Sequence, residues 1–220
     1  MYLRPATRVQ AGGGNAARST TARPVHPKRV MRKVIVQEFV SIDGLASGPN
    51  GSVDFVPASN QNDQSFGNRQ MEFIDSIDTM LLGRVTYEMF AGYWPNVTEG
   101  EDKEFAVKLN NLQKIVFSRT LDRAPWGTFG DAHIVTSDAE LEVATLKRSE
   151  GKDMVIWGSL SLAQSLMGTG LVDEYQIIVC PVVLGEGKGL FREKDARDFE
   201  LVDTRSFDRG AVLLSYRPRS

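Results

Sequence analysis

Residues that build metal and redox sites are almost missing from this chain. Its 220 residues contain one cysteine, Cys180, and two histidines, His26 and His133. A single cysteine excludes an internal disulfide and any cysteine pair spaced for zinc or thiol chemistry. A zinc site would need mostly carboxylate ligands, which is uncommon, so His133 in the apolar stretch AHIVT is interpreted as a strand residue. We expect no metal site and a reducing compartment, the cytoplasm.

Long apolar runs are also absent. No stretch approaches the roughly 18 apolar residues that indicate a membrane-spanning helix. Hydrophobic residues make up 41% of the chain and charged residues 25%, which is ordinary for a soluble globular domain. We therefore expect a soluble domain with no membrane partner.

Basic residues are scarce outside the N-terminal segment. Residues 1–30 contain six arginines and lysines and no acid, and removing these six from the chain's 26 leaves 20 basic residues against 28 acidic ones. A body with this excess of acids is a poor partner for nucleic acid, whose phosphates require a basic surface. No nucleic-acid partner is expected, although the basic tail keeps such binding as a third hypothesis beside the two given below.

The first 30 residues lack apolar periodicity, which predicts disorder. They include GGGNAA, but no strand precedes this segment and no amphipathic helix follows it, so it fails as a dinucleotide fingerprint. An acid-free, arginine-rich leader also resembles an organellar transit peptide. A start at Met31 is favoured, because MRKVIVQEFVSIDG begins a domain abruptly. The predicted organisation is a disordered basic leader at 1–30 and one domain at 31–217.

From residue 33 onward the chain alternates between strand and helix patterns. Runs of β-branched and aromatic residues predict strands, and apolar residues at spacings of three and four predict helices. The last two segments alternate like an antiparallel pair, so the fold class is α/β followed by antiparallel β. The predicted strands cover 33–41, 79–83, 114–118, 132–136, 153–157, 172–185, 199–207 and 211–218, and the predicted helices 65–77, 85–94, 102–111, 138–151 and 159–170.

Three predicted strands end in residues suited to an anion. These ends are Gly83-Arg84, Ser118-Arg119 and Gly158-Ser159. In open α/β sheets, ligands lie beyond the carboxyl ends of the strands, where helix N-termini present backbone N–H groups. Glycine lets a backbone approach a ligand closely, because it has no Cβ. The serine and Thr86 could instead cap their helices. Together the three ends predict a dinucleotide with separated phosphates.

The charges at these strand ends favour NADP over NAD. A site for a free ribose usually offers an acid to the 2′-hydroxyl, whereas a 2′-phosphate is repelled by an acid and prefers arginine. Arg84 and Arg119 both stand at strand ends, and Ser118 and Thr120 flank Arg119. The alternative for Arg119 is a solvated loop cation. NADPH is the expected cofactor.

Five segments, taken in order, resemble the dihydrofolate-reductase-like family: SIDGLASG, LLGRVTYE, IVFSRTL, WGSLSLAQSLM and GLVDEYQIIVCPVVLGEGKGLF. The closer resemblance is to the reductase domain of the bifunctional riboflavin-biosynthesis deaminase-reductase and its stand-alone relatives, over about residues 33–217. It implies a mainly parallel sheet with helices on both faces and an antiparallel C-terminal edge, NADPH as hydride donor, and commonly a homodimer. The long apolar late strands also favour a homodimer, because natural proteins cover such sheet edges.

The resemblance assigns roles to residues in each segment. Many family members have Gly-Gly where this chain has Gly158-Ser159. No carboxylate near 65–77 aligns with the pteridine-binding acid of folate reductases, so a true folate reductase is not expected. The lone cysteine also excludes the zinc set of the deaminase partner. By resemblance, the phosphates would bind to Gly83, Arg84 and Thr86, and the 2′-phosphate to Ser118 and Arg119. The pyrophosphate and nicotinamide would lie along Gly158, Ser159 and Leu160. The substrate cleft would be bordered by Asp43, Gly44, Gly185, Glu186 and Gly187.

Two functions follow as hypotheses. The leading one is an NADPH-dependent reductase of a small heterocyclic (pyrimidine- or pterin-like) or carbonyl substrate, resembling 5-amino-6-(5-phosphoribosylamino)uracil reductase. The alternative is a catalytically inactive nucleotide-binding module of the same fold. Asp43 is the candidate proton donor, unless it only forms a turn with Gly44. Trp94 is either a wall for a flat substrate or a core residue.

Overall fold

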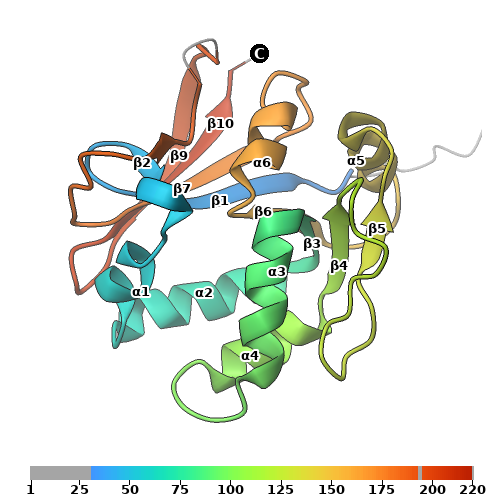
Figure 1. Cartoon of the computed structure of the whole chain (residues 1–220). Helices are drawn as coiled ribbons and strands as arrows, with labels where there is room; N and C mark the ends of the chain where they lie inside the picture. The colour runs from blue at the N-terminus through green and yellow to red at the C-terminus, as the bar shows by residue number, and fades with distance from the viewer. Residues whose placement is uncertain (1–30, 193–194, 220) are drawn as a thin grey trace, which may run out of the picture. The chain divides into compact units, whose positions relative to one another are not determined.

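The computed structural model describes residues 31–192 and 195–219. The leader at 1–30 lies outside the described residues, so its predicted disorder stays a prediction. The described chain contains an eight-stranded sheet in the order β5-β4-β3-β6-β1-β7-β10-β9 (Figure 1). Its strands are β1 (Val34–Val40), β3 (Ile77–Gly83), β4 (Gln113–Phe117), β5 (His133–Val135), β6 (Asp153–Trp157), β7 (Glu174–Val179), β9 (Phe199–Ser206) and β10 (Val212–Pro218).

The sheet is parallel from β5 to β7 and antiparallel at its far edge. β1 lies between β6 and β7, and both of its faces are buried. This burial is typical of a parallel strand that is covered from both sides. β10 pairs antiparallel with β7, and β9 pairs antiparallel with β10. The predicted α/β class, with a mainly parallel sheet and an antiparallel C-terminal edge, is confirmed.

Helices cover both faces of the sheet, because successive strand side chains point to opposite sides. On one face α2, α3 and α4 pack against a core cluster that includes Ile35. On the other face α5 and α6 pack against a cluster that includes Val34 and Val36. The helices are α1 (Phe55–Asn60), α2 (Gln64–Ser76), α3 (Arg84–Tyr93), α4 (Lys103–Asn111), α5 (Ala139–Lys147) and α6 (Leu160–Leu166), with the 3-10 turns η1 (Pro49–Gly51) and η2 (Trp94–Asn96).

The segments that follow β1 and β7 pair as a small second sheet. β2 (Leu45–Ser47) runs antiparallel to β8 (Lys188–Gly189). Gly187 permits this pairing, because its φ is 155° and a Cβ there would lie 1.9 Å from the Ser47 carbonyl oxygen. The strand predicted over 172–185 is shorter in the structure. It ends before Pro181, which has no N–H for a strand ladder.

A topological switch point lies between the neighbouring strands β3 and β6. β3 continues into α3 on one face of the sheet, whereas β6 continues into α6 on the other face. Open α/β sheets bind ligands beyond the carboxyl ends of the strands at such points. The fold therefore places the loops after β3 and β6 where a ligand is expected.

Candidate functional site

A hollow of about 440 Å³ lies beyond the carboxyl ends of β3, β4 and β5. Four predicted cofactor residues line it together: Gly83 and Arg84 after β3, and Ser118 and Arg119 after β4. Parallel strands end at the same edge of a sheet, which is why separate segments converge here. The rest of its polar wall is not predicted from the sequence and comes from the start of α5 and from α6: Ser137, Asp138, Glu140, Ser161 and Ser165.

A signal for two of the missed residues was present in the sequence. Ser161 and Ser165 are four positions apart in SLSLAQS, and this spacing puts both side chains on one face of a helix. Leu162 and Leu166 pack into the core from the same helix. The spacing of the two serines therefore indicates a polar helix face, which in the structure lines the hollow.

The hydroxyl groups of Ser159 and Thr86 join the loops after β3 and β6. Ser159 Oγ accepts a hydrogen bond from the Gly83 N–H at 2.9 Å, and Thr86 Oγ1 accepts one from the Ser159 N–H at 2.9 Å. Within the described chain, neither hydroxyl caps its own helix. The capping interpretation of these two residues is therefore wrong. Their hydroxyls instead fix the two switch-point loops against each other.

Gly158 and Ser159 form a tight turn between β6 and α6. Both have left-handed backbone angles, with φ of 54° and 55°. A Cβ at Gly158 would lie 3.3 Å from Thr86 Cγ2, so the fold itself favours glycine there. A non-glycine residue in this region costs about 1–2 kcal/mol, and the Ser159 hydrogen bond to Gly83 offsets part of that cost. Leu160 begins α6 and packs against the core.

Gly83 behaves differently from Gly158. Its φ is −81°, which any residue adopts, and a Cβ would sit 3.7 Å from Ser159 Cβ, an ordinary van der Waals distance. The chain's own packing therefore leaves room for a side chain at this position. Close approach of a ligand to the start of α3 is the remaining reason for glycine. This observation fits an anionic ligand in the hollow.

The two arginines of the hollow differ in their partners. Arg84 forms an exposed ion pair with Glu88 one turn along α3, with Nη1 2.9 Å from Glu88 Oε1. The Arg119 side chain makes no hydrogen bond or ion pair with another described residue. Ser118 Oγ accepts the N–H groups of Thr120 and Leu121, both at 3.2 Å, and so shapes the turn that presents Arg119. Arg119 is therefore the cation most available to an anion.

Two acids share the wall of the hollow with these arginines. Asp138 is the N-cap of α5, and its Oδ1 accepts the Glu140 N–H at 2.8 Å and the Leu141 N–H at 3.4 Å. Glu140 follows in the first turn of α5 and also lines the hollow. An acid at this place suits a free ribose, whereas Arg119 suits a 2′-phosphate. A comparison of NADPH with NADH therefore tests the site directly.

Asp43 joins the turn after β1 to the segment after β7. Its Oδ1 accepts the Leu184 N–H at 3.1 Å and its Oδ2 accepts the Gly185 N–H at 2.8 Å. The Ser41 hydroxyl, and then these two amides, lower the pKa of Asp43 to about 2. At neutral pH this carboxylate holds no proton, which favours a role in positioning the loops over proton donation. Gly44, with φ of 80°, completes the turn.

The other predicted substrate residues lie apart from the hollow. Glu186 is exposed beside Gly185 in the segment that Asp43 holds. Trp94 belongs to η2, and its ring packs 4.9 Å from Tyr93 and 5.3 Å from Phe105 between ring centroids. This packing on the α2, α3 and α4 face favours the interpretation of Trp94 as a core residue.

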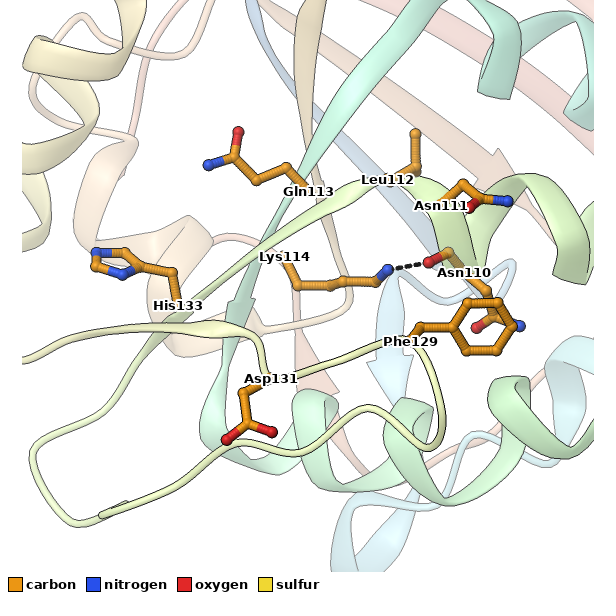
Figure 2. Close-up of a pocket in the computed structure, with 8 residues that line it drawn as sticks. All are labelled: Asn110, Asn111, Leu112, Gln113, Lys114, Phe129, Asp131 and His133. Atoms are coloured by element: carbon orange, nitrogen blue, oxygen red, sulfur yellow. Dashed lines mark hydrogen bonds between the residues drawn. The ribbon is translucent and has the colours of Figure 1, made fainter.

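A second hollow, of about 390 Å³, lies at the amino end of β4 (Figure 2). Figure 2 shows the amine of Lys114 directed at the Asn110 carbonyl oxygen, to which it donates a hydrogen bond. Burial lowers the pKa of Lys114 to about 8, and the amine lies 5.1 Å from the centre of the Trp126 ring. This lysine is engaged in packing, and none of the predicted cofactor residues lines the second hollow. Four of them line the first hollow, whereas Thr86, Gly158, Ser159 and Leu160 are not part of its lining.

Two further findings concern metals and membranes. Among the described residues, no cluster of three or more His, Cys, Asp and Glu side chains is arranged to hold a metal ion. None of the helices in the part of the chain that the structure describes is both long and apolar enough to cross a membrane.

Known structures share this fold. A diaminohydroxyphosphoribosylaminopyrimidine deaminase/5-amino-6-(5-phosphoribosylamino)uracil reductase from Thermotoga maritima superimposes with a TM-score of 0.60 at 15% identity, over 86% of this chain and 57% of that chain. Dihydrofolate reductase from Enterococcus faecalis, complexed with NADP(H), superimposes with a TM-score of 0.56 at 14% identity, over 86% of this chain and 97% of that chain. At these identities the likeness establishes the fold alone.

Sequence comparison establishes the family. Uncharacterized protein YyaP of Bacillus subtilis is 34% identical over 187 residues, which is 84% of this chain and 94% of that protein. Residues 32–213 match the RibD C-terminal domain. The resemblance found in the sequence segments is thereby confirmed, and the chain belongs to the RibD C-terminal domain family.

Proposed function

We propose that the chain is an NADPH-dependent reductase of a small heterocyclic or carbonyl substrate, which acts in the cytoplasm. The observation that carries this proposal is the hollow at the switch point, where Arg119 lacks a described protein partner and Gly83 leaves room for a ligand at the start of α3. When bound, NADPH supplies the hydride, so the protein mainly has to hold the reactants and exclude water. The name of the Thermotoga maritima relative suggests a pyrimidine-like substrate.

Different groups in the hollow would bind different parts of the cofactor. Arg119 would meet the 2′-phosphate as an exposed, permanently charged group. The backbone N–H groups at the start of α3 would meet a phosphate, supported by the helix dipole. Ser159 and Thr86 hold the loops after β3 and β6 in place, so the phosphate-binding backbone is fixed before the cofactor arrives.

Replacing Arg119 with alanine is expected to weaken NADPH binding by about 1.5–3 kcal/mol, because a charge-assisted hydrogen bond is lost. This corresponds to a roughly ten- to hundredfold rise in the dissociation constant. NADH lacks the 2′-phosphate, so its affinity should fall much less. Calorimetric titration of both cofactors measures the effect. Arg123→Ala is the matched control, because Arg123 is an exposed arginine near Arg119 that pairs with Asp131 outside this hollow.

The result for Arg84 separates two arrangements. Arg84→Ala should change stability by only about 0–1 kcal/mol, since its pair with Glu88 is exposed. An equal loss of NADPH and NADH affinity would place Arg84 at the pyrophosphate, whereas a loss confined to NADPH would place it at the 2′-phosphate. If wild type binds NADPH and neither arginine variant changes that affinity, this hollow is not the cofactor site.

Turnover distinguishes the reductase from an inactive nucleotide-binding module. Both predict NADPH binding, but only the reductase predicts oxidation of NADPH when a reducible compound is added. The decisive assay follows NADPH absorbance with a panel of pyrimidines, pterins and carbonyl compounds. Tight binding without oxidation by any compound of the panel favours the inactive module.

We also propose a homodimer, in which the exposed strand β9 pairs with a partner. The sequence predicts that 172–185 and 211–218 lie near a sheet edge, and in the structure β9 forms the edge, β10 lies beside it and β7 is the next strand inward. β9 carries two exposed apolar side chains among its polar residues, Leu201 at 50% and Val202 at 37%, and natural proteins usually cover or protect an exposed edge strand.

Light scattering is therefore expected to give the mass of two chains for the wild type. The double variant Leu201→Lys and Val202→Lys should give the mass of one chain, because edge lysines block strand pairing. A single-chain mass for the wild type across micromolar concentrations would remove the dimer, and an unchanged two-chain mass for the double variant would move the interface away from β9.

A further inference from the structure

Glu38 is a buried acid in the middle of the molecule. It lies on the central strand β1 and is 5% exposed. One carboxyl oxygen, Oε2, finds no hydrogen-bond partner among residues 31–192 and 195–219. Buried polar groups are normally hydrogen-bonded, and each exception in a folded protein calls for an explanation. Glu38 thus has an oxygen available to a partner that the described residues do not provide.

The position of Glu38 connects it to the switch-point loop. The parallel register of β1 and β6 ends at the pair Gln37 and Trp157. The next residue along β1 is Glu38, and the next along β6 is Gly158, which begins the loop that Thr86 and Ser159 fasten. The acid therefore lies near the carboxyl end of β1, beside the loop after β6, and behind the residues that line the hollow, which do not include Glu38.

The surroundings of Glu38 on its face of the sheet are apolar. Val36 and Val40 flank it on β1, and Ile177 is its register partner on β7. α6 covers this face with leucine and alanine side chains that belong to the same core cluster. Burial raises the pKa of Glu38 to about 8, and a hydrogen bond with the Phe39 backbone lowers it by less. The carboxyl group is therefore protonated at neutral pH and can act as a donor.

We propose that Glu38 is the proton donor of the site and that its free oxygen faces the bound ligand rings. This inference rests on the proposed reductase function. Asp43 is ionised at neutral pH and engaged with the Leu184 and Gly185 amides, so it is poorly suited to the task. Reduction of a C=N or C=O group requires a hydride at carbon and a proton at nitrogen or oxygen. Glu38 would supply that proton.

The proton balance is simple. The substrate carbon gains the hydride and is reduced, and the neighbouring nitrogen or oxygen gains the proton from Glu38. Glu38 becomes a carboxylate and regains a proton from water before the next turnover. A positioned acid of this kind typically contributes 10²–10⁴-fold to the rate.

Infrared difference spectroscopy tests the inference without turnover. At pH 7 the wild-type-minus-Glu38→Gln spectrum should contain the carbonyl band of a protonated carboxyl group. Saturating NADPH should shift this band, because the nicotinamide would lie against the free oxygen. Selective ¹³C labelling of glutamate shows whether the band comes from a glutamate in the wild type alone, so this part of the test stands even where the variant folds poorly.

Kinetics supply the second readout, on any compound that the wild type reduces. Glu38→Gln should lower kcat about 100-fold or more, with NADPH affinity unchanged. Glu38→Asp keeps the acid on a shorter arm and should recover part of kcat. Glu174→Gln is the matched control: it makes the same change on the neighbouring strand β7, at the amino end, and should keep wild-type kcat.

The outcomes separate this inference from the proposed function. If the wild type does not bind NADPH, the proposed function fails and the inference fails with it. If NADPH binds but the carboxyl band is missing or does not shift, Glu38 does not face the ligand. A buried water that hydrogen-bonds to Oε2 would give this result. The reductase proposal would then still stand. Wild-type kcat in Glu38→Gln would likewise overturn the role of Glu38 alone.

Discussion

Glu38→Gln is expected to make the protein more stable at pH 7 while it removes a proposed site residue. Burial raises the pKa of Glu38 from 4.5 to about 8. Between these two values the unfolded chain releases the proton and the folded chain keeps it, so wild-type stability falls as pH rises. Between the two pKa values, each pH unit lowers the wild-type free energy of unfolding by about 1.4 kcal/mol. The free energy of unfolding of the variant at pH 7 should therefore exceed that of the wild type by about 2–4 kcal/mol. Urea unfolding at several pH values measures this gain.

The pH dependence separates this effect from a general change in packing. At pH 4.5 and below, the folded and unfolded wild-type chains both carry a largely protonated Glu38, so the gain should shrink toward zero. Tyr175, on the same sheet face, does not titrate in this window, because burial raises its pKa to about 12. A stability difference that is equal at pH 4.5 and pH 7 would contradict the raised pKa.

A stability gain joined to a loss of turnover would be informative. Natural proteins retain destabilising groups where function needs them, and the cost appears as lower stability than the fold could reach. A buried acid without a role in the reaction would show the same pH-dependent gain, because the gain follows from burial alone, but it would show no loss of rate. The loss of kcat is therefore the result that bears on function.

Local patterns in the sequence were sufficient to predict four residues that line the hollow at the carboxyl ends of β3 and β4. A buried strand that ends in Gly-Arg or Ser-Arg can be recognised from adjacent residues, and the ends of parallel strands meet at one edge. Gly83 and Arg119 were therefore found together before the fold was known. The sheet was equally accessible, because runs of β-branched residues alternate with helical patterns from β1 to β7.

The hydrogen bonds of Asp43 and Ser159 and the burial of Glu38 depend on distant parts of the chain, so the sequence alone does not predict them. Asp43 binds the amide of Gly185, which is 142 residues away, and Ser159 binds that of Gly83, which is 76 residues away. Neither partner is signalled by neighbouring letters. Glu38 follows Gln37 in a strand, and the sequence alone does not tell which of the two polar side chains has all its hydrogen-bond partners inside the fold.

Gln37→Leu is expected to destabilise the protein by about 2–5 kcal/mol, because it leaves buried polar groups without partners. Gln37 is 1% exposed on the α2 side of β1. Its Oε1 accepts the Trp157 indole N–H at 2.7 Å and the Gln70 amide at 3.0 Å, and its Nε2 donates to Gln176 Oε1 at 2.9 Å. Leucine fills similar space but offers none of these bonds. Urea unfolding at pH 7 measures the loss.

The double variant Gln37→Leu and Gln176→Leu tests the cause of that loss. Replacing both partners of a buried hydrogen bond with apolar groups costs much less than removing one, because no acceptor is left stranded. The double variant should therefore lose less than the sum of the two single variants, by about 1 kcal/mol or more. Strict additivity would mean that the hydrogen bond between Gln37 and Gln176 adds no stability of its own, and the loss in Gln37→Leu would then come from the bonds to Trp157 and Gln70. Gln37 on one face of β1 is thus interpreted as structural because its side chain is hydrogen-bonded. Glu38 on the other face is proposed to be functional because one of its oxygens has no partner among the described residues.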